Sequence, residues 1–177
     1  MRSAEGVSGS WEKVLIFLLC SYASFLLLVF VDVKWLVDKI PLTVPFKSLA
    51  VFGGFFVVFW VVLARRLCGK FYGVFTAILA VSMCLLVSPW FGVTKPEWFS
   101  VFGLISFLAL GVLTEAFNGG VGNLACSLIN WAGAFAFHVA NVTFEGVIVM
   151  SVVAFASGYI GDLIARRFSE LLRTAFF

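Results

Sequence analysis

Long apolar segments without charged side chains dominate this sequence. Six of them, at roughly residues 14–31, 46–64, 71–88, 98–117, 121–140 and 146–165, approach the ~20 residues that an α-helix needs to cross the hydrocarbon core of a membrane. Charged residues make up 12% of the chain, and nearly all of them fall outside these segments. Because a charge near the bilayer centre costs about 3 kcal/mol on insertion, this distribution is typical of a protein embedded in a bilayer.

The same segments are apolar on all sides, whereas the strands of a membrane β-barrel alternate between apolar and polar residues. The breaks between them contain residues that end helices, including Pro41, Pro45, Pro89 and the Gly119-Gly120 pair. The sequence therefore predicts an all-α polytopic membrane protein with six transmembrane helices. We expect a cytoplasmic N-terminal tail with no removed signal at residues 1–13, the transmembrane domain at 14–167 and a cytoplasmic C-terminal tail at 168–177.

The basic residues predict the orientation of these helices. With six spans, both termini share one side of the membrane with the second and fourth loops. That side holds eight of the twelve basic residues, including all six arginines. The positive-inside rule therefore places both termini in the cytoplasm of a multi-pass protein of the cell membrane. The net charge of +3 follows from this asymmetry, so it requires no nucleic-acid partner.

Sites for metals, cofactors or catalysis are not evident in the sequence. The four cysteines (Cys20, Cys68, Cys84 and Cys126) show no Cys-x-x-Cys spacing, and the one histidine, His138, has no thiol or carboxylate at ligand spacing. Paired carboxylates, a Ser-His-Asp set and a phosphate-binding loop are not evident either. We therefore expect no metal, no cofactor and no covalent chemistry.

Polar residues in the fifth predicted helix point to a binding site. At 3.6 residues per turn, Asn130, Trp131, His138 and Asn141 fall within roughly a third of the circumference of one helix. Polar groups at membrane depth are unfavourable unless they line a cavity or find partners, so we predict that these side chains bind a substrate. Two alternatives remain: His138 at the headgroup level, and an interhelical hydrogen bond from Asn130.

The first outer loop, residues 32–45, is the longest predicted connection between spans. It has apolar content, Trp35 and two prolines, which suit a cap folded over a pocket better than a slack linker. Trp35 and Trp131 are expected to stack on a flat organic ligand, while the amides and His138 hydrogen-bond to its edge.

Small residues at helical spacing predict close helix contacts. They recur on the fifth span (Ala132, Ala136, Ala140), on the sixth (Ser157, Gly161, Ala165) and on the first (Cys20, Ser21, Ala23, Ser24). On the fifth and sixth spans we expect packing within the bundle. On the first span, a contact with a partner subunit and packing within the chain are equally compatible with the pattern.

Together these features resemble the substrate-binding S component of energy-coupling factor (ECF) vitamin transporters. The resemblance rests on the six short spans, the capping loop and two stretches, LARRLCGKFYG at 63–73 and ASGYIGDLIARR at 156–167. It implies that a vitamin-like small organic molecule binds from the outer side, at the first loop and the last three helices. It also implies that the first helix meets a transmembrane coupling subunit driven by two ATPases, at the positions that Cys20 to Ser24 occupy.

Two other function classes stay open. Glu115 lies near the cytoplasmic end of the fourth span, beside Asn118 and Asn123, where an ionisable group suits a proton-coupled carrier, a stand-alone small-molecule carrier or a small membrane enzyme. A carboxylate at the wetted interface is the simpler interpretation of Glu115. The remaining class is a purely structural membrane subunit.

Overall fold

The computed structural model describes residues 9–30, 49–91, 97–138 and 143–176. Within these ranges the chain forms six α-helices and two short helical turns, and it contains no strand. They are α1 (Ser10–Phe30), η1 (Leu49–Gly53), α3 (Gly54–Cys68), α4 (Tyr72–Leu86), η2 (Ser88–Phe91), α5 (Glu97–Ala116), α6 (Gly119–Ala136) and α7 (Phe144–Phe176). The all-α prediction is confirmed for the described residues.

Each of the six predicted spans coincides with a helix, and four helices are apolar and long enough to cross a membrane. These are Ser10–Phe30, Ala50–Cys68, Phe99–Ala116 and Phe144–Ala175. The apolar helix α4 is shorter, with 15 residues. Helix α6 has 18 residues but contains two asparagines and four glycines, which lower its mean hydropathy. The protein thus has the helices of a membrane protein.

The last helix is longer than the sequence predicts. Instead of ending near residue 165 and leaving a tail from 168, α7 continues to Phe176. The extension packs on α3: the ring centroids of Phe168 and Phe59 lie 5.8 Å apart, and Leu172 packs against the cluster that contains Leu63 and Leu67. This packing gives residues 168–176 a reason to stay helical.

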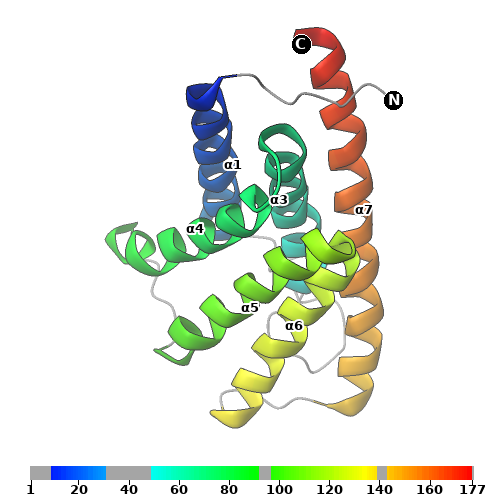
Figure 1. Cartoon of the computed structure of the whole chain (residues 1–177). Helices are drawn as coiled ribbons and strands as arrows, with labels where there is room; N and C mark the ends of the chain where they lie inside the picture. Colours follow the sequence, from blue (N-terminus) through cyan, green and yellow to red (C-terminus); the bar gives the residue numbers. More distant parts are fainter. Residues whose placement is uncertain (1–8, 31–48, 92–96, 139–142, 177) are drawn as a thin grey trace.

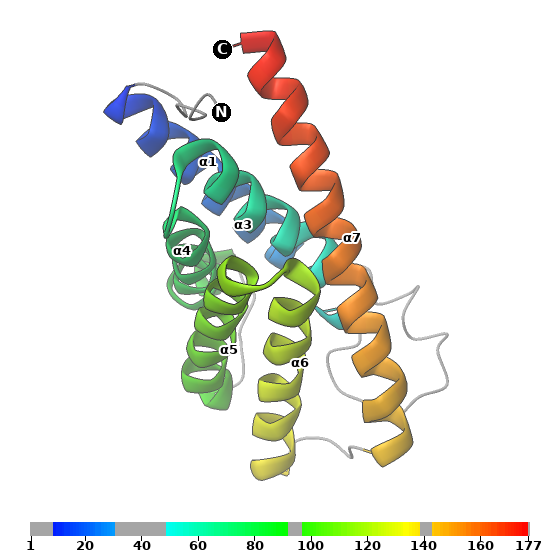
Figure 2. The same ribbon diagram turned by 45° about the vertical axis from the view of Figure 1, so that its right-hand side comes forward.

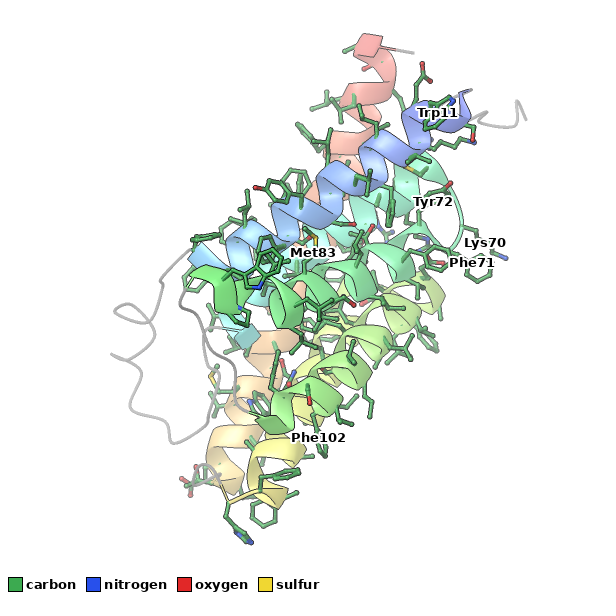
Figure 3. The ribbon with its side chains drawn as sticks, turned by 90° about the vertical axis from the view of Figure 1, so that its left-hand side faces the viewer. Trp11, Lys70, Phe71, Tyr72, Met83 and Phe102 are labelled. Atoms are coloured by element: carbon green, nitrogen blue, oxygen red, sulfur yellow. The ribbon has the colours of Figure 1, made fainter. Side chains whose placement is uncertain are left out.

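The helices form one bundle in which α7 runs along a whole side of the molecule (Figures 1 and 2). The N-terminal end of α1 and the C-terminal end of α7 lie at the same end of this bundle (Figure 1). Trp11 lies toward that end and Phe102 toward the opposite end (Figure 3). Arg173 donates to the carbonyl oxygen of Arg66, and Cys68 donates to that of Lys13. The basic residues of α1, α3 and α7 therefore gather at one end.

Helix α3 is the centre of the bundle, because it contacts each of the other five α-helices. Its buried face is built mainly from valines, including Val57, Val58, Val61 and Val62. These side chains pack with Phe107 and residues of α4, α6 and α7 in the largest core cluster. Stiff, β-branched side chains suit such a contact because they lose little rotamer freedom on burial.

The start of the second span departs from regular α-helix. Leu49–Gly53 forms a π turn that runs directly into α3 at Gly54. The carbonyl oxygen of Ala50 accepts a hydrogen bond from the Asn123 amide, and that of Val51 accepts one from Ser157. Side chains from α6 and α7 thus bind the altered backbone, as membrane proteins require where a helix loses its regular pattern.

Glycines let α3, α6 and α7 approach closely around this turn. A Cβ atom on Gly158 would lie 2.4 Å from the carbonyl oxygen of Gly119, and one on Gly161 would lie 2.6 Å from that of Phe55. A Cβ atom on Gly54 would meet the Asn123 amide. The small residues of the sixth predicted span therefore pack within the bundle, with Ala165 fully buried.

The small residues of the fifth predicted span do not behave in this way. Ala132 and Ala136 are exposed on α6, and Ala140 lies outside the described residues. The buried small residues of α6 are instead Gly119, Gly120, Gly122 and Gly133, together with Ala134. Glycine permits a closer backbone approach than alanine, which explains why the packed face lies there.

We predict that Gly158→Ala destabilises the bundle. The added methyl group meets backbone and Cβ atoms that cannot rotate away, so the free energy of unfolding should fall by about 2 kcal/mol despite the higher helix propensity of alanine. The thermal midpoint in detergent measures this loss. The control is Ala156→Leu, a larger increase in volume at an exposed position of the same helix, which should leave the midpoint unchanged. Equal midpoints for Gly158→Ala and the unmodified chain would contradict the close contact.

Candidate functional site

A row of buried polar side chains follows one face of α6. Asn123, Ser127 and Asn130 are spaced by four and three residues, so they lie above one another on the helix. Each is at most 1% exposed. We call these three residues the α6 polar row.

Asn123 occupies the end of the row that meets the π turn. Its Nδ2 atom donates to the carbonyl oxygen of Ala50 at 3.1 Å and to that of Ala154 in α7 at 2.7 Å. Both amide hydrogens are thereby used, and Asn123 links the second span to α7. Its Oδ1 atom has no hydrogen-bond partner among the described residues.

Asn130 occupies the other end of the row, toward α5. Its Nδ2 atom donates to Ser106 Oγ at 3.0 Å and to the carbonyl oxygen of Cys126 at 2.9 Å. The Ser106 hydroxyl donates in turn to the carbonyl oxygen of Gly103. The interhelical hydrogen bond that the sequence offered as an alternative for Asn130 is therefore present.

The row is left with three acceptors that the described protein does not use. These are Asn123 Oδ1, Ser127 Oγ and Asn130 Oδ1, all buried and without a hydrogen-bond partner in the described ranges. An unpaired buried acceptor costs about 1 to 3 kcal/mol, so three on one helix face form an unusual arrangement for a structural core. Such a face can accept hydrogen bonds from a bound molecule, and it is the candidate site of this protein.

The predicted site residues divide between different surroundings. Trp131 is 3% exposed and packs with Ala50, Met150 and Ala154, on the side of α6 that faces α7. Asn130, its neighbour in the chain, bonds to α5. His138 follows the end of α6 with φ 52° and is exposed. Trp35 and Asn141 lie outside the described residues. The structure therefore brings Asn130 and Trp131 into the bundle and leaves His138 at its surface.

The residues expected to meet a partner subunit lie mostly inside the bundle. Cys20, Ser21 and Ser24 are buried, and Cys20 packs with Leu63, Ala64 and Leu67 of α3. Ala23 is half-buried. Of the two interpretations that the small residues allowed, packing within the chain holds for these three, because α1 covers the short side chains of α3 with its own.

Glu115 is a helix cap in this structure. Its carboxylate accepts hydrogen bonds from the backbone N–H groups of Phe71 at 3.0 Å, Gly73 at 3.1 Å and Val74 at 3.3 Å. These groups lie at the N-terminus of α4, where the N–H groups lack partners within the helix and the dipole favours a negative charge. Phe71 has φ 69°, in the left-handed region, and no side chain of its own that can cap. Glu115 of α5 supplies the acceptor instead.

Asp162 has the same role for α6. Its Oδ2 atom accepts from the Gly119 N–H group at 3.1 Å, while the Asn118 side chain accepts from Val121. Both Asp162 oxygens also bind the Arg166 guanidinium at 2.7 Å. The carboxylate is 2% exposed, so the arginine and the helix N-terminus balance its buried charge.

Metal-binding clusters are not found in the ranges that the structure describes: no three side chains of histidine, cysteine, aspartate or glutamate lie together there. The four cysteines are all free and buried. The donors of the α6 polar row are oxygen atoms of uncharged side chains, which suit an organic ligand better than a transition metal.

Ser127 was missed by the sequence analysis, and Asn123 was considered only as a neighbour of Glu115. The spacing of Asn123, Ser127 and Asn130 by four and three residues was the available signal. Trp131 and His138 drew attention to a different face of the same helix.

No protein-family model matches the chain, and no curated protein or solved structure matches it.

We predict that Glu115→Ala lowers the free energy of unfolding by about 1 to 2 kcal/mol, because three N–H groups at the start of α4 lose their acceptor. Glu115→Gln keeps one acceptor oxygen and should fall in between. Thermal midpoints in detergent measure both effects. Glu170→Ala, at an exposed residue paired only with Arg167, is the matched control and should change little. A loss of proton-dependent transport in Glu115→Gln at unchanged stability would instead indicate a proton carrier.

Proposed function

We propose that this chain is the membrane-embedded substrate-capture subunit of an ECF-type importer, which binds a small organic micronutrient and performs no covalent chemistry. The observation that carries the proposal is the α6 polar row, with three buried acceptors that the described protein leaves unused. In a bundle of apolar helices, such acceptors are best explained by a guest that donates to them. The six-helix order and the resemblance of residues 63–73 and 156–167 to the S component support the same conclusion.

The chemistry of the row indicates the kind of ligand. The Nδ2 groups of Asn123 and Asn130 already donate to the protein, so the free atoms are two amide oxygens, which only accept, and one hydroxyl oxygen. Helix α6 contains no charged residue. A molecule with N–H or O–H groups, such as an amine or an amino-substituted heterocycle, matches this row, whereas a carboxylate or phosphate would find no basic partner there.

Membrane orientation is part of the proposal. We place the protein in the cell membrane with six spans and both termini in the cytoplasm. The gathering of Lys13, Arg66 and Arg173 at one end of the bundle supports this topology, because positive charges favour the cytoplasmic side. The substrate would then enter from the end at which α6 finishes and α7 begins.

Delivery of the substrate would need a transmembrane coupling subunit and two ATPases, as in the family that the sequence resembles. Because Cys20, Ser21 and Ser24 pack on α3, the opposite face of α1 is the one open to such a subunit. That face contains large exposed apolar side chains, namely Leu15, Leu18, Leu19 and Tyr22.

The alternatives are weaker for a physical reason in each case. A proton-coupled carrier would need an ionisable group in the membrane interior, and the carboxylate of Glu115 is engaged as a cap of α4. A structural subunit would explain why Asn123 and Asn130 donate to neighbouring helices, but it leaves their oxygens without a role.

Ligand binding to the purified chain tests the proposal. A panel of vitamins and related heterocycles is titrated while tryptophan fluorescence is recorded, since Trp131 lies next to Asn130 in the chain. Saturable quenching at micromolar concentration is expected for a compound with N–H donors. Trp131→Phe should reduce the signal, whereas Trp11→Phe, at an exposed tryptophan on α1, should not. A panel in which nothing quenches contradicts capture of these compounds.

Ser127→Ala separates binding from folding. The Ser127 hydroxyl makes no hydrogen bond to the described protein, so its removal should leave the thermal midpoint unchanged. Loss of one hydrogen bond to the ligand should weaken binding about fivefold. Ser21→Ala, which removes a buried hydroxyl bonded to the Phe17 carbonyl oxygen, is the control and should leave binding unchanged. A lower midpoint with normal binding in Ser127→Ala would assign the row to folding alone.

Topology is tested by fusing a reporter to the C-terminus. Green fluorescent protein should be fluorescent there and alkaline phosphatase inactive, because both results report a cytoplasmic end. The reverse pair of results would place the basic end of the bundle outside the cell and contradict the proposed orientation.

A further inference from the structure

Three arginines lie together where the C-terminal halves of α3 and α7 pack. Arg166 and Arg173 are seven residues apart on α7 and therefore share a face of that helix. Arg173 donates through Nη2 to the carbonyl oxygen of Arg66 on α3. All three side chains are half-buried. We call Arg66, Arg166 and Arg173 the arginine cluster.

The cluster has more positive charge than its surroundings balance. Asp162 is the carboxylate that pairs with it, through both of its oxygens, and it binds only Arg166. Arg66 and Arg173 form no ion pair within the described ranges. Arg66 is close enough to Arg166 and Arg173 for their charges to repel one another. An anion bound here would relieve that repulsion.

An apolar strip on α7 leads up to the cluster. Phe155, Tyr159 and Leu163 follow one another at intervals of four residues, and all three are exposed. The rings of Phe155 and Tyr159 are stacked, with centroids 6.1 Å apart. Tyr159 lies two turns below Arg166 on nearly the same side of the helix. A long apolar chain placed along this strip would end at the arginines.

We propose that the arginine cluster binds the phosphate of an anionic phospholipid, whose acyl chain lies along the strip of Phe155, Tyr159 and Leu163. The guanidinium groups match the geometry and charge of a phosphate group. The exposed strip lies within a helix long and apolar enough to cross the membrane, at the end where the basic residues gather. Charge and apolar surface thus fit the two parts of one lipid molecule, and the site is separate from the α6 polar row.

Lipid preference of the purified full chain tests this site. Native mass spectrometry compares retention of phosphatidylglycerol with that of phosphatidylcholine with the same acyl chains. The unmodified chain should prefer phosphatidylglycerol, and this lipid should raise the thermal midpoint more than phosphatidylcholine does. The double variant Arg66→Gln/Arg173→Gln should lower the preference about thirtyfold, because each arginine contributes about a fivefold factor near an anionic headgroup.

Two further variants and one competitor make the outcome decisive. Arg66→Lys/Arg173→Lys keeps the charge and should keep most of the preference. Arg167→Gln, at a side chain 86% exposed and paired with Glu170, should not change it. A loss in Arg167→Gln equal to that of the double variant, or equal retention of the two lipids by the unmodified chain, would overturn the proposal. Inorganic phosphate at millimolar concentration should not raise the midpoint, and an equal rise would assign the cluster to a soluble anion instead.

Discussion

The backbone around the π turn at Leu49–Gly53 is the constraint on which the bundle depends. In a bilayer no water is available to carbonyl groups that leave the regular helical pattern, so other helices must supply donors. Asn123 and Ser157 do so from α6 and α7, to the carbonyl oxygens of Ala50 and Val51. The central helix α3 begins at this point, and the glycines at positions 54, 119, 158 and 161 bring the three helices close enough for these bonds to form.

The same need for internal partners explains the two buried acidic residues. Glu115 and Asp162 each serve the N-terminus of a helix other than their own, at α4 and α6 respectively. A carboxylate near the membrane interface is stabilised by such an N-terminus, and the N–H groups gain acceptors. These contacts tie α5 to α4 and α7 to α6 at the end of the molecule where the basic residues gather, so they stabilise the bundle rather than provide chemistry.

The α6 polar row differs from these satisfied groups and for that reason is the basis of the proposed function. Its amide hydrogens hold the bundle together while its oxygens remain unused. One helix face thus serves both packing and ligand binding. Removal of an amide would disturb both, whereas removal of the Ser127 hydroxyl affects the ligand alone. A similar separation holds at the other end of the molecule, where the arginine cluster offers a lipid site that is independent of the substrate.

The sequence by itself determined the helical class and the approximate position of all six helices, because length and hydropathy are local properties of the chain. It also identified Asn130 and Trp131 as buried in the bundle. Only the tertiary structure decided what each polar residue contacts: that Glu115 caps α4, that Cys20 and Ser24 pack inward, that α7 continues to Phe176 and that Asn123 binds the π turn. These contacts join residues more than thirty positions apart or depend on which side of a helix faces a neighbour, and helical periodicity alone does not contain that information.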